Sequence, residues 1–269
     1  MIKGNHKAAV VIPFYRHAIS DFEAIALKQC LSVLRHHPII VIKPHSLNLP
    51  AALAQNLLSA VIGFDDRYFD GIKGYNSLML SADFYRAFLD YEFILIYQLD
   101  AFVFKDELNY WCSLNYDYIG APWLKRKDYS PVKDNFYKLK YYLHTQFNFK
   151  KQGVPTMDQF YDKVGNGGFS LRRVKKFYEL STTLRAEATS YISKNIDRFN
   201  EDAFWSIAVN RRKQHLNIPD YKVGVAFAFE FHPDRALRIN RGVLPFGCHA
   251  WPKYLNYWRP VFKNYGYDI

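Results

Sequence analysis

The sequence has no apolar run long enough to cross a membrane. Its longest apolar runs, Ala8–Phe14 and Phe93–Tyr97, have the length of single strands, whereas a spanning helix needs roughly 18–20 apolar residues. Basic residues precede the first run, but that run is too short for a signal peptide. Pro13 interrupts it, and no small-residue cleavage site follows. We therefore expect a cytoplasmic protein.

Cysteine is scarce, and the motifs of nucleic-acid-binding proteins are missing. Cys30, Cys112 and Cys248 are odd in number and far apart, with no CxxC pair. This pattern is typical of reduced thiols in a reducing compartment. The sequence contains no zinc finger, RNP motif or basic zipper, so we do not expect a nucleic-acid partner.

Positive charge and aromatic side chains are present in excess. Among 269 residues, 36 Lys and Arg stand against 25 Asp and Glu, a net charge of +11. This excess favours an anionic partner, such as a nucleotide phosphate or an anionic membrane leaflet. Aromatic residues make up 18%; their faces suit bases, sugars and membrane interfaces, although most of them must lie in a core. Hydrophobic residues at 49% and charged residues at 23% fit a globular protein, and we expect a single domain over residues 1–269.

The first half of the chain alternates strand and helix patterns. Continuous apolar runs predict buried strands at Ala8–Pro13, Pro38–Ile42, Ala60–Phe64 and Tyr91–Tyr97. Apolar residues at helical spacing predict helices at Asp21–Arg35 (with Ser20 as N-cap), Leu49–Leu58 and Asn76–Leu89. Repeated strand–helix units of this length predict an α/β fold with a mostly parallel, twisted central sheet.

The second half is less regular. Residues 124–162 are rich in Tyr, Lys and Phe and are expected to form an irregular insertion. Helical patterns return at Arg172–Leu180 and Asn200–Asn210, and residues 245–269 are expected to form an irregular strap over the surface. Ligands of open α/β sheets bind at the carboxyl ends of the strands, so the segments that follow the predicted strands are where a site is expected.

Two candidate motifs adjoin strands. Gln98-Leu99-Asp100 places a carboxylate at the end of a central strand, where a hard divalent cation bridging two phosphates finds an oxygen ligand; an Asp in an ordinary turn explains it equally well. The run Val164–Arg172 contains three glycines around Asn166, which permit close approach of the backbone to a ligand. It is neither a Walker loop nor GxGxxG, and a tight turn into a strand at Phe169–Leu171 also explains it.

Two further motifs carry acid–base groups. Asn200-Glu201-Asp202 opens a predicted helix, where the helix dipole favours carboxylates. The choice there is between simple helix capping and a general base beside an acceptor hydroxyl. His249, among small and aromatic residues, fits either a metal ligand or a hydrogen-bonded core residue, and taken alone the core explanation is favoured.

In their order along the chain, these motifs resemble the GT-A glycosyltransferases. In that family a strand ends in a DxD motif that holds a metal on the diphosphate of a nucleotide sugar. A later xED motif supplies the catalytic base of inverting members, and a late His often completes the metal site. The resemblance implies a GT-A, Rossmann-like nucleotide-sugar-binding fold, with Mn²⁺ or Mg²⁺ at Asp100 and His249. It implies Asp202 as the base, and Glu201 as a residue that binds the acceptor or positions Asp202.

A closer resemblance is carried by the strings YQLDAFVF, YDYIGAPW, VGNGGFSLR, NEDAFW and PFGCHAW. They look like a bacterial family catalogued as a domain of unknown function and related to GT-A enzymes, and the likeness extends from Val10 to about Trp251. One departure is Gln98, which replaces the first Asp of DxD: its amide can accept a hydrogen bond from ribose but adds no charge. Some GT-A members use basic residues instead of a metal, so the metal requirement stays open.

The remaining donor-site residues follow from their positions in this resemblance. Residues after the first strand would receive the uridine of a UDP sugar, with Phe14 or Tyr15 at the base and Arg16 at the diphosphate. The glycine turn would border the donor sugar and the acceptor. The predicted donor-binding residues are Pro13, Phe14, Tyr15, Arg16, Lys43, Asn76, Gln98, Asp100, Asn166, Gly167 and Gly168.

The activity implied is that of an inverting hexosyltransferase acting on a glycan or lipid-linked acceptor in bacterial surface polysaccharide synthesis. The stretches Asp128–Lys151 and Trp251–Tyr267 are candidate contacts with an anionic leaflet, and an ordinary solvated basic surface is an equally good explanation of both.

Two rival functions remain. A sugar-nucleotide pyrophosphorylase-like nucleotidyltransferase would carry a glycine- and arginine-rich loop after the first strand, and this chain does not. A non-catalytic carbohydrate- or membrane-binding protein would not require Asp100, Asp202 and His249 to converge. The arrangement of these three side chains in space therefore discriminates between the hypotheses.

Overall fold

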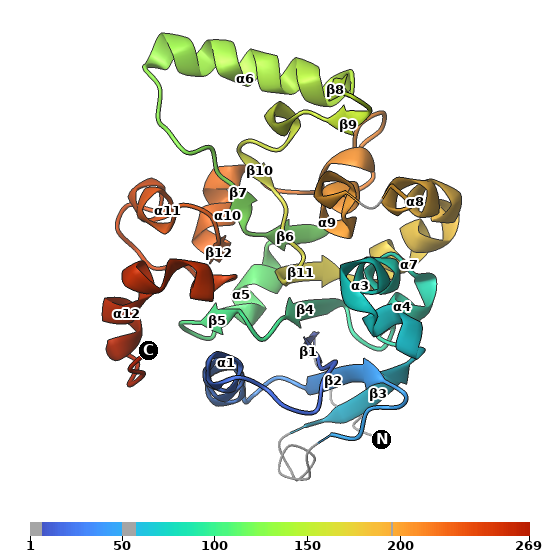
Figure 1. The fold of residues 1–269 in the computed structure, drawn as a ribbon. Coiled ribbons are helices and arrows are strands. Elements are labelled where there is room, and N and C mark those ends of the chain that lie inside the picture. The colour runs from blue at the N-terminus through green and yellow to red at the C-terminus, as the bar shows by residue number, and fades with distance from the viewer. Residues whose placement is uncertain (1–6, 50–57, 195) are drawn as a thin grey trace.

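The computed structural model describes residues 7–49, 58–194 and 196–269, and a six-stranded sheet runs through it in the order β3-β2-β1-β4-β11-β6 (Figure 1). The strands of this sheet are β1 (Ala8–Pro13), β2 (Ile39–Pro44), β3 (Ala60–Phe64), β4 (Phe93–Tyr97), β6 (Tyr118–Gly120) and β11 (Phe169–Arg173). β3, β2, β1 and β4 are parallel to one another, and β11 runs antiparallel to both β4 and β6. The prediction of an α/β fold with a mostly parallel sheet is confirmed.

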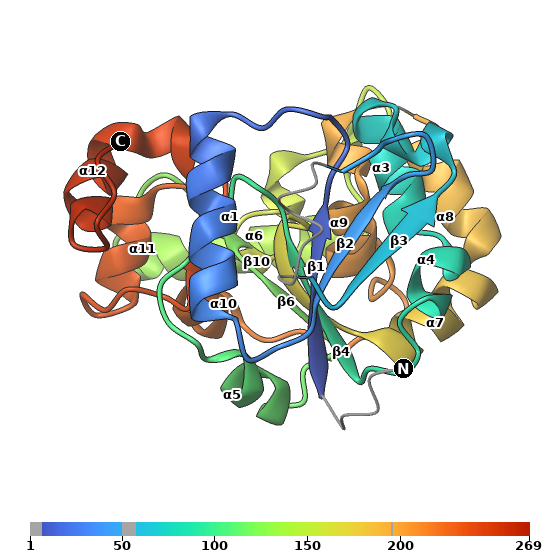
Figure 2. The same ribbon diagram turned by 90° about the horizontal axis from the view of Figure 1, so that it is seen from below.

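The sheet is covered on both faces, which explains why its central strands are continuous apolar runs. Alternate residues of β1 point to opposite sides: Val10 packs in a core with α1 (Asp21–Val33), and Val11 packs in a second core with α3 (Gly71–Met79) and α4 (Ala82–Arg86). α7 (Val174–Thr183) and α8 (Arg185–Ile192) extend the second core. Figure 2 shows α1 on one side of the sheet and these four helices on the other.

A third core is built by the C-terminal part of the chain. The small sheet β12-β13-β5 joins Ala228–Phe229, Gly247–Cys248 and Phe102–Val103. Around it lie α10 (Tyr221–Phe227), α11 (Pro233–Ile239), the 3₁₀ turn η5 (Trp251–Tyr254) and α12 (Leu255–Lys263). The prediction of an irregular strap at 245–269 is therefore wrong: Trp251, Trp258 and Phe262 are core side chains, and their burial folds the segment into helix.

The segment 124–162 is also regular where irregular structure was predicted. It begins after β7 (Pro122–Trp123) and ends before β10 (Lys163–Val164), and these two strands pair antiparallel. Between them lies α6 (Pro131–Gln146). A short hairpin of β8 (Lys150–Lys151) and β9 (Val154–Pro155) follows the helix. Figure 1 shows α6 along the outer edge of the molecule, away from the main sheet.

Most elements of the first half lie within a few residues of their predicted positions. β1 and β3 match the predicted bounds, and Ser20 caps α1 in a capping box with Glu23. The predicted helix Asn76–Leu89 is wrong in its continuity. It is two helices, α3 and α4, because Ser81 interrupts the first and accepts the Phe84 amide to cap the second. The predicted helix Leu49–Leu58 lies largely outside the described residues.

Two helices of the second half also differ from prediction. Arg172 belongs to strand β11, so the predicted helix Arg172–Leu180 begins only at Val174. The predicted helix Asn200–Asn210 is a short α9 (Glu201–Ala203) followed by a π-helical turn at Phe204–Ala208. The other short elements are α5 (Leu108–Ser113) and the 3₁₀ turns η1 (Asp66–Phe69), η2 (Met157–Gln159) and η3 (Asp197–Phe199). Within the described ranges, no helix has both the length and the apolar character needed to span a membrane.

Candidate active site

The antiparallel register of β4 and β11 creates the centre of the site. Phe169 pairs with Tyr97, so the residue before β11 lies beside the residue after β4. The Gln98 amide donates to the carbonyl of Gly168 at 2.8 Å. The strand-end motif and the glycine turn are thus neighbours at the carboxyl edge of the parallel strands, where open α/β sheets bind ligands.

His249 is brought to the same place by the small sheet. Cys248 of β13 pairs with Phe102 of β5, two residues after Asp100. The imidazole Nε2 of His249 lies 3.0 Å from Asp100 Oδ1 and 3.3 Å from Gln98 Oε1, and its Nδ1 lies 3.3 Å from Glu230 Oε1. The predicted pair Asp100 and His249 is therefore in contact.

The opposite charges of Asp100 and His249 shift each other's pKa values toward the charged forms. Burial lowers the pKa of His249, but the charge of Asp100 and hydrogen bonds to Asp100 and Glu230 outweigh burial and raise that pKa to about 10. Burial raises the pKa of Asp100, but the charge and hydrogen bond of His249, with a smaller effect of Lys253, bring it below its ordinary value. In the protein alone, Asp100 and His249 thus form an ion pair, and the Asp100 side chain remains 41% exposed and accessible to a ligand.

The glycine turn is shaped by side chains that press against it. Asn166 has φ +60°, and its Oδ1 accepts the amides of Gly168 at 3.0 Å and Phe169 at 3.2 Å, which holds the turn closed. A Cβ at Gly168 would lie 2.1 Å from His249 Nε2. A Cβ at Gly167 would lie 2.0 Å from a carboxylate oxygen of Glu201. Glycine is required at both positions because site side chains occupy the space.

A buried ion pair fixes the acidic helix start to the main sheet. Arg172 of β11 is fully buried and contacts Glu201 through two bonds, Nη2–Oε1 at 2.9 Å and Nη1–Oε2 at 3.1 Å. Its remaining donors reach Ser170 Oγ at 3.1 Å and the Tyr85 hydroxyl at 2.9 Å. The charge of Glu201 raises the pKa of Arg172 further above its ordinary range, although burial opposes this. Glu201 was predicted to bind the acceptor or to position Asp202. Its carboxylate is buried and paired with Arg172, so it is not free to bind an acceptor in this structure.

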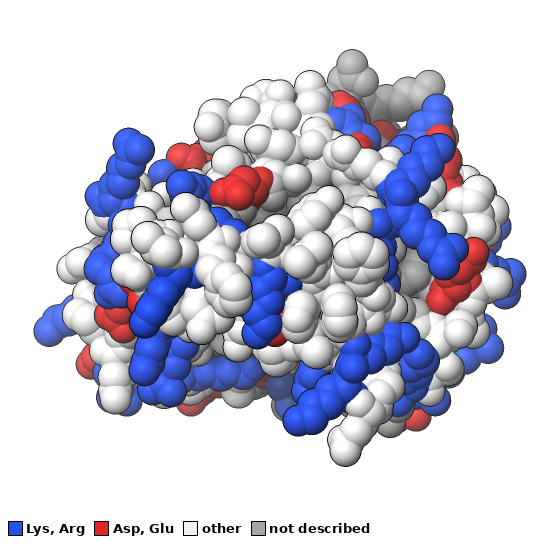
Figure 3. All heavy atoms as spheres, turned by 90° about the horizontal axis from the view of Figure 1, so that it is seen from above, with Lys and Arg blue, Asp and Glu red and all other residues white. Residues whose placement is uncertain are grey.

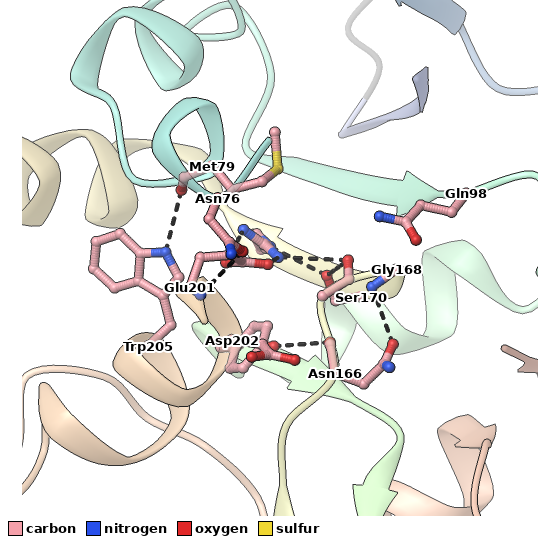
Figure 4. Close-up of polar contacts among 12 residues, drawn as sticks. Asn76, Met79, Gln98, Asn166, Gly168, Ser170, Glu201, Asp202 and Trp205 are labelled. Carbon is pink, nitrogen blue, oxygen red and sulfur yellow. Dashed lines mark hydrogen bonds and ion pairs between the residues drawn. The ribbon is translucent and has the colours of Figure 1, made fainter. Parts of the chain in front are cut away.

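Asn76 belongs to the same framework. Its side-chain amide donates to Asn200 Oδ1 at 2.9 Å, and its Oδ1 accepts the Glu201 amide at 3.2 Å. Asn76 was predicted to face the nucleotide; the structure instead places it, buried, under the start of α9 (Figure 4).

Asp202 follows this anchored start and is the less constrained of the two acids. Its only side-chain hydrogen bond within the described residues is from the Ala203 amide at 2.7 Å. Burial, followed by the negative charges of Glu201 and Glu230, raises the pKa of Asp202 to about 7. Glu230 also contacts His249, so it is a common neighbour of Asp202 and the Asp100–His249 pair. Figure 4 shows Asp202, Asn166, Gly168 and Gln98 around one turn.

The predicted donor residues after β1 divide into two kinds. Pro13 and Phe14 are buried, and Phe14 packs in the core under α1, out of reach of a base. Tyr15 and Arg16 are exposed at the same sheet edge as Asp100. Burial and Glu23 raise the pKa of Tyr15, and Asp100 adds to this effect, which shows that Tyr15 lies near the site.

Two basic residues after the strands have other partners. Arg16 Nη2 lies 2.5 Å from Glu23 Oε1, the acid that also closes the capping box of α1. Lys43 Nζ donates to the carbonyls of Pro44 at 3.1 Å and His45 at 3.4 Å, and so turns back on its own strand end.

Sequence reasoning missed four contributors to this site. Glu230, Lys253 and Tyr75 lie around the Asp100–His249 pair or Gln98, and Arg172 was considered only as the first residue of a predicted helix. The Tyr75 hydroxyl is buried near Gln98, and no described residue forms a hydrogen bond with it. Glu230 could have been found, because it directly follows an aromatic strand, as Asp100 follows its own.

The protein offers few metal ligands. Among the described residues, no group of three or more His, Cys, Asp and Glu side chains is arranged to hold a metal ion. Asp100 and His249 supply two such side chains, and Gln98 adds a neutral oxygen 3.3 Å from the imidazole. The donor set is thus one carboxylate oxygen, one imidazole nitrogen and one amide oxygen, which leaves several positions of a divalent ion to a ligand such as a diphosphate.

The protein also has a cavity that the predicted site residues do not line. A cavity of about 640 Å³ between α3, α4, α7 and α8 is lined by Arg67, Lys73, Ser77, Ser181 and Arg185, among others, and by none of the predicted site residues.

The order and directions of the strands give the protein an α/β fold of GT-A type. The chain belongs to the family described as "Protein of unknown function (DUF5672)", whose model matches residues 59–249. Among curated proteins, no sequence matches this chain significantly.

Solved structures share the fold. The apo form of mouse xyloside xylosyltransferase 1 superposes with a TM-score of 0.50 at 13% sequence identity, over 90% of this chain and 96% of that one. The apo form of the glycosyltransferase GlyE of Streptococcus pneumoniae TIGR4 gives a TM-score of 0.48 at 15% identity, over 91% of this chain and 54% of that one.

Removing one partner of the Arg172–Glu201 pair should destabilise the protein strongly. Arg172→Met leaves the Glu201 carboxylate buried and uncompensated, a loss of about 3–5 kcal/mol in the free energy of unfolding. Urea denaturation measures this loss. The matched control is Arg86→Met, because Arg86 pairs with Asp83 at 2.7 Å with both side chains exposed, and such a pair contributes less than about 1 kcal/mol. Equal losses in the two variants would contradict the anchoring role.

The raised pKa of Asp202 predicts a stability that falls as pH rises. The folded pKa of about 7 exceeds the ordinary value of 3.8, so the folded state holds the proton and loses stability between these two pH values. Asn resembles the protonated acid and does not ionise. Asp202→Asn should therefore match the unchanged protein in Tm near pH 4 and exceed it near pH 8. A constant Tm difference across this range would show that Asp202 ionises normally.

Proposed function

We propose that the protein transfers a sugar from a nucleotide sugar, with UDP as the nucleotide, to a hydroxyl of a glycan or lipid-linked acceptor. The observation that carries this proposal is the direct contact of Asp100 with His249 at the sheet edge, beside an Asp202 whose pKa is raised to about 7. A non-catalytic binding protein would not need Asp100, His249 and Asp202 in one region of the sheet edge. The resemblance of the sequence to bacterial GT-A relatives supports surface polysaccharide synthesis as the setting.

The donor would bind with its diphosphate at Asp100 and His249 and its uridine toward β1. Tyr15 is exposed near Asp100 and offers a ring for the base, and Gln98 offers an uncharged acceptor for a ribose hydroxyl. Lys253 already acts on Asp100 by its charge and would act on a diphosphate in the same way. Arg16 would have to exchange its bond to Glu23 for a phosphate.

A divalent ion fits the residues present. Asp100 Oδ1 and His249 Nε2 lie side by side, 3.0 Å apart. Asp100 and His249 would hold Mn²⁺ or Mg²⁺, with Gln98 as a neutral neighbour, and His249 would first release the proton that its raised pKa retains in the protein alone. Such an ion would supply Lewis-acid stabilisation of the departing diphosphate.

Asp202 would act as the general base. Its carboxylate takes the proton of the acceptor hydroxyl while the acceptor oxygen forms a bond to the anomeric carbon. The bond from that carbon to the diphosphate breaks, and its electron pair leaves on the phosphate oxygen, so the anomeric carbon inverts. A pKa near the working pH suits a base, and the Arg172–Glu201 pair holds the backbone that carries it.

Replacing Asp202 should separate catalysis from donor binding. Asp202→Asn keeps the shape of the side chain and removes the proton acceptor, so turnover should fall by a factor of about 10²–10⁴ with donor affinity nearly unchanged. In the unchanged protein, kcat/KM should rise with pH through about 7, because only the ionised acid accepts a proton. Turnover of released nucleotide against pH measures both. Normal turnover in Asp202→Asn would exclude Asp202 as the base.

Replacing Asp100 should abolish metal-dependent nucleotide binding. Calorimetric titration of UDP with and without Mn²⁺ measures this, and Asp100→Ala removes the one carboxylate of the donor set. His249→Ala should weaken the same binding, by less if water fills its position. The matched control is Asp65→Ala, because Asp65 follows parallel strand β3 as Asp100 follows β4. Unchanged metal dependence in Asp100→Ala would contradict the assignment.

A further inference from the structure

Helix α6 exposes an apolar stripe to solvent. Val132, Phe136, Leu139 and Leu143 recur at the spacing of one helix face, and their exposed fractions are 82%, 66%, 57% and 38%. Phe147, just beyond the helix, is 71% exposed. Large apolar side chains are usually buried, so this continuous stripe requires an explanation that the fold does not supply.

The opposite face of α6 is the one that packs on the protein. Tyr141 and Thr145 are buried there, and Asp134 forms ion pairs with Lys125 and Lys138. The helix is thus anchored through polar and aromatic contacts and directs its aliphatic side chains outward. This orientation is the reverse of that of an ordinary surface helix.

Positive charge surrounds the stripe. Exposed basic residues flank it in the sequence and in the hairpin that follows the helix: Arg126, Lys127, Lys133, Lys150 and Lys151. None of these five forms an ion pair with a described residue. Figure 3 looks down on this side of the molecule, where uncharged side chains cover much of the surface, Lys and Arg side chains lie among and around them, and acidic residues are few.

The basic side chains at the hairpin end crowd one another. Burial, followed by the charges of Lys194 and Arg211, lowers the pKa of Lys150. Lys150 therefore lies within electrostatic reach of two other cations, Lys194 and Arg211. Like charges so placed repel in the free protein, and an anionic surface relieves that repulsion.

We propose that α6 docks the protein on the surface of an anionic lipid bilayer. Val132, Phe136, Leu139, Leu143 and Phe147 enter the boundary between headgroups and acyl chains, and the surrounding Lys and Arg side chains contact lipid phosphates. A second copy of the chain is the poorer occupant, because a two-fold contact through the stripe would place the two basic rims against each other.

The placement of α6 connects this surface to the site. The segment that carries α6 returns through β10, and Gly165 and Asn166 of the glycine turn follow directly. The docking surface and the turn are therefore joined by a paired strand. Docking itself does not depend on the proposed function, since it requires only the stripe and its basic rim.

The test uses co-sedimentation with phosphatidylcholine vesicles, with and without phosphatidylglycerol. The unchanged protein should bind the anionic vesicles at low salt, release them at high salt, and bind neutral vesicles far more weakly. The variant Phe136→Ser/Leu139→Ser should lower the partition coefficient by about tenfold or more. The control is Ile72→Ser/Val243→Ser, two residues with exposed fractions of 68% and 56% that lie outside α6; it should bind as the unchanged protein does.

Charge variants test the rim separately. Lys133→Gln and Lys151→Gln should each weaken binding about fivefold, whereas Lys175→Gln, an exposed lysine on α7, should have no effect. Absence of binding to anionic vesicles at low salt would overturn the proposal. Equal binding by the stripe and control variants would do so as well. A concentration-dependent dimer that Phe136→Ser abolishes, without vesicle binding, would identify a second copy as the occupant.

Discussion

The site depends on the buried ion pair between Arg172 and Glu201. Two charges removed from water cost several kcal/mol each, and the fold offsets this cost by giving the guanidinium a carboxylate, the Ser170 hydroxyl and the Tyr85 hydroxyl. The pair joins β11 of the main sheet to the first residue of α9. It therefore sets the position of Asp202, the next residue, against the glycine turn that opens β11. Asn76 adds a second attachment at the same helix start.

The second constraint is the closeness of His249 to the turn. There is no space for a side chain at Gly168, because the imidazole and the Gln98 amide occupy it. The imidazole in turn contacts Asp100, Glu230 and the side-chain amide of Asn166, so four segments of the chain, its own included, meet at one ring. Among the described residues, the Tyr75 hydroxyl beside Gln98 and Oε2 of Glu230 are buried polar atoms of this cluster without a hydrogen-bond partner. The Asp100 side chain at this sheet edge is partly exposed. Asp202, near the glycine turn, is an acid with a raised pKa.

Sequence patterns correctly predicted the elements whose structure depends on residues close together in the chain. β1 and the Ser20 cap follow from a short apolar run and a capping box. The Arg172–Glu201 pair was not predictable, because its two residues are distant in the chain and arginine is usually a surface residue. The glycine turn was recognised, but for another reason: its glycines make room for His249 and Glu201 rather than only for a ligand. α6 was missed although its apolar spacing is regular, because mixed Tyr and Lys residues obscured a stripe that faces solvent.

The most direct test of the account is a crystal structure of the protein with UDP and Mn²⁺. The diphosphate and one Mn²⁺ should lie at Asp100 and His249, the uracil should lie near Tyr15, and Asp202 should face the side from which an acceptor would attack. Nucleotide bound instead in the cavity lined by Arg67, Lys73 and Arg185, or bound at the sheet edge without contact to Asp100 and His249, would contradict it.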